Sequence, residues 1–272
     1  MKKTRIIAIA NQKGGVGKTT TAVNLATCLA AADHMTLMID LDPQANATSG
    51  VGINQRSLEK SIYDLLINQA DFKEVLQPTM LECLDLLPAE QRLVGGEIEL
   101  ADGQWGRTRL RDILTTLSHD YEFIVIDCPP SLGLLTFNGL VAADRVLVPL
   151  QCEYYALEGL AFLMDTIGLV RGSYNPDLEL EGIVLTMFDC RTSLSKQVAS
   201  DAREAFGTKV FEAVIPRNVA LGEAPSYGKP ILFYDIKSQG AKSYLQLTKE
   251  VINNGIENGQ ESVGARAASV AC

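Results

Sequence analysis

The chain carries at residues 12–20 the stretch Gln12-Lys13-Gly14-Gly15-Val16-Gly17-Lys18-Thr19-Thr20. It follows an apolar run, residues 6–10, that is typical of a buried strand, and a helical pattern continues from Lys18 to about Ala32. A strand, a glycine-rich turn and a helix start place backbone N–H groups at the positive end of a helix, where they bind phosphate. The general motif is G-x-x-x-x-G-K-[ST], and the chain departs from it only at Gln12. The stretch predicts a phosphate-binding loop in a P-loop α/β fold.

A second lysine, Lys13, precedes the glycines of this loop. Lys18 occupies the motif position that reaches the phosphates, so a site built from one chain has no need of Lys13. A second buried cation is unfavourable unless it meets an anion of its own. We therefore expect Lys13 to point out of its own site and toward the ATP bound by a second copy of the chain.

Four further motifs follow the loop. They are Asp40-Leu41-Asp42-Pro43-Gln44-Ala45-Asn46, Asp127-Cys128-Pro129-Pro130-Ser131, Gln151-Cys152-Glu153-Tyr154-Tyr155-Ala156-Leu157-Glu158-Gly159, and Ile215-Pro216-Arg217-Asn218 with Glu223-Ala224-Pro225-Ser226. In this order and spacing, the chain resembles the deviant Walker-A ATPases, in which the lysine before G-G-x-G-K-[ST] crosses a dimer interface. It is most similar to the ParA/Soj branch, which partitions chromosomes and plasmids. The resemblance extends from Ile6 to about Asn253.

Within the loop, Lys18 is expected to bridge the β- and γ-phosphates of ATP, and the Thr19 hydroxyl to coordinate Mg²⁺. Thr20 can reach the α-phosphate. A glycine-rich turn that binds no nucleotide is the alternative. The candidate nucleotide-binding residues of the loop are Lys13, Gly14, Gly15, Val16, Gly17, Lys18, Thr19 and Thr20.

Three carboxylates follow strand-like runs. Asp127 ends the run 123–126, as a Walker-B aspartate does, and would hold Mg²⁺ through a water; a cap on the next turn is the alternative. Asp40 and Asp42 project to the same side of an extended segment, where two carboxylates repel each other and need a cation. The resemblance implies that Asp42 is catalytic and orients the attacking water, while Asp40 supports the metal from behind. A solvated acidic turn is the alternative for both.

The resemblance assigns further contacts with the nucleotide. Lys13, with Lys18, would be catalytic by neutralising charge on the phosphates, Lys13 acting on those of the partner. Glu153 would approach the partner's nucleotide or lysine, although it could be an ordinary loop glutamate. Pro216 and Asn218 would contact the adenine, although Pro216 could simply end a strand.

The family binds DNA through basic residues of its C-terminal third. Arg191, in Phe188-Asp189-Cys190-Arg191-Thr192, matches one such position. A second basic residue often follows Asn-Val in this branch, but here Ala220 takes its place. Candidate substitutes, each of which could also be a solvated surface charge, are Arg217, Lys196, Lys229, Lys237 and Lys242.

Apolar strand-like runs alternate with helical patterns, at residues 6–10, 36–39, 84–87, 123–126, 146–149, 182–187 and 210–215. This alternation predicts a doubly wound, mostly parallel sheet with helices on both faces. Ligands of such sheets bind beyond the carboxyl ends of the strands, where the three aspartates lie. We expect an irregular surface insertion, with a short helix at its start, at residues 90–107. A single ATPase domain is expected over residues 1–254 and a disordered tail over 255–272.

Composition restricts the possible functions. Six scattered cysteines without a C-x-x-C pair favour a reduced, cytosolic chain, and the apolar runs are too short to span a membrane. The net charge of −9 differs from that of basic DNA-binding domains. However, residues 21–184 carry 9 basic and 24 acidic side chains, whereas residues 185–242 carry 8 and 6. The C-terminal third is therefore the surface that repels DNA least.

The resemblance thus implies slow hydrolysis of ATP, with Mg²⁺, in a sandwich dimer that binds nonspecific double-stranded DNA on the nucleoid. A ParB-like partner would stimulate hydrolysis. A ParA-like positioner of a protein cargo shares this chemistry, and the neighbouring gene would separate the two. A MinD-like membrane ATPase would need an amphipathic C-terminal helix, for which residues 250–272 have too few apolar and basic residues.

Overall fold

The computed structural model describes residues 4–102, 106–116 and 120–269. Within them, one sheet has the strand order β3-β4-β2-β5-β1-β6-β7-β8, and all neighbours are parallel except β3 and β4. The strands are β1 (Arg5–Ile9), β2 (Thr36–Asp40), β3 (Gln77–Pro78), β4 (Leu84–Leu87), β5 (Phe123–Asp127), β6 (Arg145–Gln151), β7 (Glu179–Phe188) and β8 (Val210–Pro216). The predicted mostly parallel fold is confirmed.

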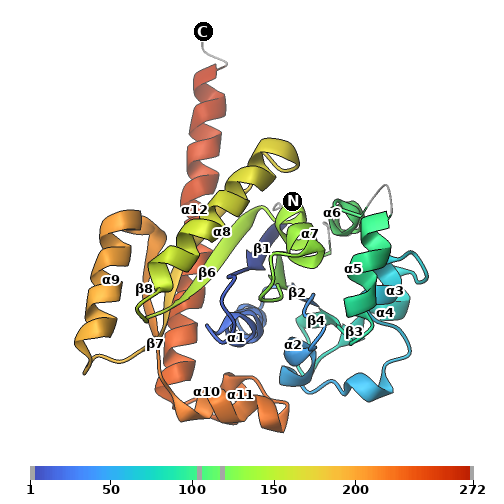
Figure 1. The fold of residues 1–272 in the computed structure, drawn as a ribbon, viewed down its shortest axis with the longest axis horizontal. Helices are drawn as coiled ribbons and strands as arrows, with labels where there is room; N and C mark the ends of the chain where they lie inside the picture. The colour runs from blue at the N-terminus through green and yellow to red at the C-terminus, as the bar shows by residue number, and fades with distance from the viewer. Residues whose placement is uncertain (1–3, 103–105, 117–119, 270–272) are drawn as a thin grey trace.

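Helices cover both faces of this sheet (Figure 1). The longer ones are α1 (Lys18–Ala31), α5 (Leu93–Asp102), α6 (Arg109–Thr115), α7 (Leu134–Ala142), α8 (Ala156–Ser173), α9 (Ser193–Phe206) and α12 (Gln239–Ser269). The shorter ones are α2 (Asn46–Gly50), η1 (Gln55–Ser57), α3 (Ile62–Leu66), α4 (Phe72–Val75), η2 (Gly207–Lys209), α10 (Val219–Glu223), η3 (Ala224–Tyr227) and α11 (Ile231–Tyr234).

Alternate residues of each strand enter separate cores on the two faces. In β1, Ala8 packs in the core beneath α3 and α5 to α9, whereas Ile7 and Ile9 pack in the core beneath α1, α2 and α10 to α12. β2 and β5 are buried along their whole length. Strands that are apolar on both faces suit a parallel sheet covered on both sides, and this arrangement brings the carboxyl ends of β1, β2 and β5 to one edge.

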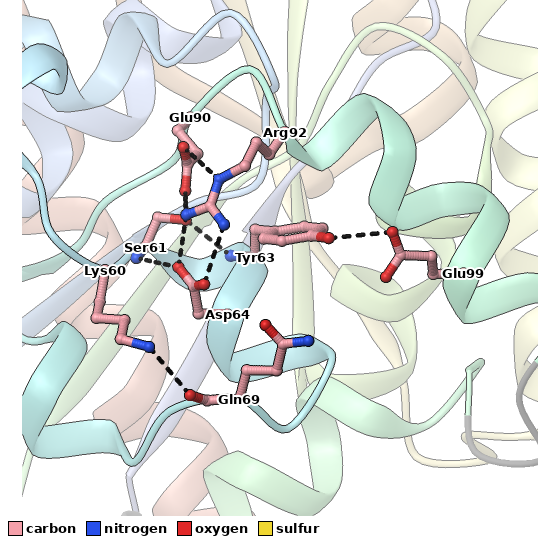
Figure 2. A network of polar contacts seen from close by, with 8 residues as sticks. All are labelled: Lys60, Ser61, Tyr63, Asp64, Gln69, Glu90, Arg92 and Glu99. Atoms are coloured by element: carbon pink, nitrogen blue, oxygen red, sulfur yellow. Dashed lines mark hydrogen bonds and ion pairs between the residues drawn. The ribbon is translucent and has the colours of Figure 1, made fainter.

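The sequence predicts a short helix at the start of residues 90–107, and the structure has a helix of ten residues there, α5, which extends over much of the expected irregular insertion. A polar network holds this helix to α3 (Figure 2). Arg92 pairs with Asp64 at 2.9 Å and lies 4.7 Å from the centre of the Tyr63 ring. Gly96 makes the close packing possible, since a Cβ atom there would lie 3.1 Å from that ring. Residues 103–105 lie outside the described chain.

The C-terminal helix is longer than the sequence predicts. α12 packs on the sheet through Tyr244, Leu247 and Val251, all buried, and projects beyond the rest of the protein (Figure 1). Its backbone is helical over residues 255–269, where the sequence predicts a disordered tail. Residues 270–272 lie outside the described chain, and the division into a domain and a tail stays a prediction. No described helix has the length and apolar character needed to cross a membrane.

Candidate nucleotide-binding site

The phosphate loop connects β1 to α1 at the carboxyl edge of the sheet. Gly15 and Gly17 have φ angles of 74° and 91°, which glycine adopts more readily than other residues. Val16 is buried, and its carbonyl accepts a hydrogen bond of 2.8 Å from the Thr186 hydroxyl of β7. No side chain caps the N-terminus of α1 within the described residues, and its first turn has no acid. Its N–H groups are therefore oriented for an anion, which fits the phosphates of ATP.

The Lys18 side chain folds back across the loop and donates a hydrogen bond of 2.9 Å to the carbonyl oxygen of Lys13. Burial lowers the pKa of Lys18, while the charges of Asp127 and Asp42 oppose this shift. These three charged groups thus lie together, as the sequence predicts for a site that binds phosphate and a metal. A buried ammonium at the start of a helix fits the β- and γ-phosphate position of the motif.

Asp127 ends β5 and is fully buried. Neither carboxylate oxygen has a hydrogen-bond partner within the described residues. The Thr19 hydroxyl is close enough to lower the pKa of Asp127, although it lies outside hydrogen-bonding geometry. Burial and the charge of Asp40 raise the pKa of Asp127 well above the usual range. Buried polar groups without partners are rare, and a hard cation such as Mg²⁺ would pair this one. Asp127 and Thr19 therefore fit Mg²⁺.

The protein supplies few other ligands to such an ion. No group of three His, Cys, Asp or Glu side chains suited to a metal occurs in the described part of the chain. Mg²⁺ in nucleotide sites commonly keeps several waters and binds substrate phosphates with one or two protein ligands. The donor set at Asp127 and Thr19 is of this kind.

Asp40 is engaged by its own chain. Its Oδ2 accepts hydrogen bonds of 2.8 Å from both the backbone N–H and the hydroxyl of Thr48, and its Oδ1 accepts one of 3.0 Å from Asp42 N–H. Burial raises the pKa of Asp40 to about 7, although these hydrogen bonds act to lower it. Asp40 therefore fixes the turn that leads into α2, and its contacts fit an indirect role behind the metal rather than a direct ligand.

Asp42 lies in that turn, nearly buried, at the carboxyl end of β2. Its Oδ1 accepts a hydrogen bond of 2.9 Å from Gln44 N–H, and its carbonyl accepts one of 2.8 Å from Ala45 N–H. Ala45 has a φ of 50°, an unfavourable angle for alanine that the surrounding turn imposes. The turn holds the Asp42 carboxylate near Lys18, where it could orient a water.

Lys13 lies outside this cluster. Its Nζ is 2.7 Å from Oε2 of Glu153, and both side chains are partly exposed, at 41% and 45%. Glu153 follows β6 and also accepts a hydrogen bond from the Gln151 amide. The structure therefore brings two residues of the predicted interface together within one chain.

A cavity of about 240 Å³ lies beside Gly17 and Thr20 and fits the adenine side of the nucleotide. Pro216 and Asn218 line it, as predicted, and Asn218 Oδ1 caps α10 through the N–H of Leu221 at 3.2 Å. Arg217, predicted to contact DNA, also lines this cavity. Sequence reasoning did not identify its other lining residues: Thr186, Met187, Ile215, Leu221, Gly222 and Tyr244. Only the position of Thr186 at the end of a strand could have indicated them.

The other predicted DNA contacts do not line this cavity. Arg191 follows β7 and its side chain is 84% exposed. Ala220 lies in α10, where the family often has a basic residue. The other basic candidates are exposed as well and are spread over α9, the loops on either side of α11, and α12: Lys196, Lys229, Lys237 and Lys242.

The chain is similar to known proteins along most of its length. Residues 4–180 match a family model described as an AAA domain. The chromosome partitioning protein ParA of Myxococcus xanthus is 56% identical over 248 residues, which are 91% of this chain and 88% of that protein. The sporulation initiation inhibitor protein Soj of Bacillus subtilis is 53% identical over 92% of this chain and 99% of that protein.

Among solved structures, a protein described as cobyrinic acid a,c-diamide synthase of Mycobacterium smegmatis, with a bound ATP analogue and magnesium, superposes with a TM-score of 0.75. It is 38% identical, and the match covers 83% of this chain and 93% of that chain. The geometry of the phosphate loop, the aspartates at the carboxyl ends of β2 and β5, and the similarity to ParA and Soj agree. The chain belongs to the ParA/Soj family of deviant Walker-A ATPases.

Proposed function

We propose that this protein is an ATP hydrolase that partitions chromosomal DNA through a nucleotide-dependent dimer. The observation that carries the proposal is that Lys13, the additional lysine of the phosphate loop, pairs with the partly exposed Glu153, whereas Lys18 lies near the buried Asp127 and Asp42. The identity to chromosome partitioning proteins supports the biological role.

The chemistry follows from the residues at the sheet edge. Lys18 and the free N–H groups of α1 bind the phosphates, and Thr19 and Asp127 hold Mg²⁺. When bound, Mg²⁺ neutralises phosphate charge and orients the γ-phosphate for in-line attack. Asp42 orients the attacking water, and Asp40 holds the turn that carries Asp42. We expect hydrolysis to stay slow in one chain, because Lys13 is paired there with Glu153.

Dimerisation completes this site. When two copies enclose two ATP molecules, Lys13 of one copy can reach the phosphates of the other, as an arginine finger does in trans. The Lys13 ammonium then leaves the Glu153 carboxylate and pairs with the more highly charged phosphates of the other copy's ATP. A partly exposed ion pair is worth little, about 0–1 kcal/mol, so this exchange meets little resistance. Glu153, once released, can approach the partner's nucleotide or lysine.

DNA would bind to the ATP-bound dimer rather than to the monomer. The chain has a net charge of −9, so one copy is repelled by DNA. Pairing two copies doubles each basic contact on an aligned face, with Arg191 as the main candidate. A ParB-like partner would then stimulate hydrolysis and release the dimer. The protein would accordingly act in the cytoplasm, on the nucleoid.

One experiment tests this proposal directly. Size-exclusion chromatography with light scattering would measure the oligomeric state in ATP, ADP and no nucleotide, and fluorescence anisotropy would measure binding to two duplexes of unrelated sequence. We expect a dimer and DNA binding with ATP alone, the same affinity for both duplexes, and a log–log salt slope of about −0.9 per phosphate neutralised. A monomer in ATP, or DNA binding that ignores the nucleotide, would contradict the proposal.

A further inference from the structure

The guanidinium of Arg191 is exposed, but it is already paired with a carboxylate of its own chain. Its Nε and Nη2 donate hydrogen bonds of 2.9 and 2.7 Å to the two carboxylate oxygens of Asp189. Asp189 is only 22% exposed, whereas the arginine side chain is 84% exposed. The acid is therefore the more buried partner, and the exposed arginine side chain lies against it.

Asp189 also faces a second arginine. Hydrogen bonds from Arg191 hold the pKa of Asp189 well below its usual range, and the positive charge of Arg217 contributes to this shift. Arg217 is nearby because its N–H donates to the carbonyl of Phe188, the residue before Asp189, at 3.3 Å. The Asp189 carboxylate thus lies near both Arg191 and Arg217, which are expected to form the basic surface, and its charge cancels one of theirs.

The consequence for phosphate binding follows from competition. A phosphate that contacts Arg191 must displace Asp189 from two N–H groups or share the guanidinium with it. Near the pair, the negative charge of Asp189 also repels the phosphate. Contacts with DNA phosphates depend on released counterions and hence on net local charge. A neutral Asp189–Arg191 pair releases fewer counterions than a single arginine.

We propose that Asp189 limits the DNA affinity of the ATP-bound dimer by competing with DNA phosphates for the guanidinium of Arg191. This inference rests on the proposed DNA binding and adds to it a residue that sets its strength. A weakened contact suits a protein that must leave DNA after each round of hydrolysis. In the dimer the effect doubles, because each copy carries one such pair.

Asp189 has a second role that determines the choice of variant. Its Oδ1 accepts a hydrogen bond of 3.0 Å from Arg191 N–H, and its carbonyl accepts one of 3.1 Å from Thr192, which caps α9. Asparagine keeps both acceptors and the same shape but removes the charge. Asp189→Asn therefore preserves the turn, whereas alanine would disturb it.

The test is fluorescence anisotropy of the full chain in ATP and Mg²⁺ with a random duplex, across a salt series. One added phosphate contact per copy should make the log–log slope of the dimer steeper by about 2, and each contact is worth up to roughly tenfold in affinity at 0.1 M salt. We expect Asp189→Asn to bind more tightly with this steeper slope. In the Arg191→Ala background, Asp189→Asn should give a clearly smaller gain, because it then removes only the repulsion of the phosphate and the interaction with Arg217. Circular dichroism checks that each variant is folded.

Asp177→Asn is the matched control. Asp177 is exposed and precedes β7, whereas Asp189 follows this strand, so the same charge change occurs at the opposite edge of the sheet. It should leave the DNA affinity close to that of the wild type. Equal gains from Asp177→Asn and Asp189→Asn, or a full gain without Arg191, would overturn the inference. The inference would also be overturned if the wild type binds DNA and Asp189→Asn binds it with the same affinity, although the proposed function would then stand. If neither the wild type nor Asp189→Asn binds DNA, both fall.

Discussion

Lys13 and Glu153 form an ion pair within one chain, with 2.7 Å between Nζ and Oε2. The lysine comes from the phosphate loop and the glutamate from the segment after β6, 140 residues later. The pair gives the lysine an anionic partner within its own chain. It therefore connects two features that the sequence separates, the additional lysine of the loop and the acidic motif that follows the sixth strand.

Releasing this pair should favour dimerisation. Glu153→Gln keeps the shape of the side chain and removes its charge, so Lys13 loses its partner in the monomer. Since a partly exposed pair is worth about 0.2–1 kcal/mol, the ATP-dependent dimer should tighten by roughly 1.4- to 5-fold for each copy. Analytical ultracentrifugation over a concentration series measures this. If the variant no longer dimerises, Glu153 acts across the interface instead, and its role in holding Lys13 is not the important one.

Removing the charge of Asp127 should have opposite effects on the two states of the protein. Asp127→Asn replaces a buried carboxylate that has no hydrogen-bond partner among the described residues. The nucleotide-free protein should therefore melt at a higher temperature at pH 8, by roughly 2–4 °C for each kcal/mol gained. The stabilisation by Mg²⁺ and ATP should fall.

Differential scanning fluorimetry, with and without Mg²⁺-ATP, follows both quantities in one experiment. Asp144→Asn, at the opposite edge of the sheet, controls for the loss of one negative charge. An unchanged response to Mg²⁺-ATP in Asp127→Asn would remove Asp127 from the metal site.

Asp42→Ala should trap the ATP-bound dimer. The carboxylate proposed to orient water is lost, while Lys18 and Thr19, the proposed phosphate and metal contacts, remain, so we expect slower hydrolysis with the nucleotide still bound. One positioned acid–base group is worth about 10²–10⁴-fold in rate. Phosphate release and light scattering, measured on the same sample, should show little hydrolysis and a persistent dimer. Hydrolysis at the wild-type rate would exclude this role for Asp42.

The DNA surface should respond to changes in charge at two positions. Arg191→Glu should weaken ATP-dependent binding severely, because it reverses a phosphate contact in each copy. Ala220→Arg restores a basic residue where the family often has one and should tighten binding, with a steeper dependence on salt. Ala220 is partly buried in α10, so a folded-state control by circular dichroism is needed. Binding that survives Arg191→Glu unchanged would indicate that the surface partner is not DNA.

Much of the fold could be predicted from the sequence because long apolar runs mark the buried parallel strands. The seven predicted runs all became strands, and α1 begins at the predicted Lys18. β3 was missed, since a pair of residues, Gln77 and Pro78, carries no pattern. α5 is longer than the short helix predicted for this segment, because Gly95 and Gly96 lower helix propensity, whereas packing against Tyr63 stabilises the helix.

The site was predictable in its parts but not in its contacts. The motif at residues 12–20 and the strand-end aspartates indicate phosphate and metal chemistry. The pairing of Asp40 with Thr48 depends on how the turn folds, and that of Lys13 with Glu153 depends on how β1 and β6 align. Such tertiary contacts leave no signal in a single sequence. The pair of Asp189 and Arg191 is local, and the Asp-x-Arg spacing could have suggested it.

The central claim is that Lys13 acts on the ATP of a second copy, and Lys13→Ala tests it most directly. Light scattering after size-exclusion chromatography, with ATP and Mg²⁺, measures the mass, and a fluorescent ATP analogue measures binding. We predict that Lys13→Ala binds the analogue but stays monomeric, whereas Lys18→Ala, the control within the same loop, binds none. A Lys13→Ala protein that dimerises in ATP as the wild type does would contradict the account.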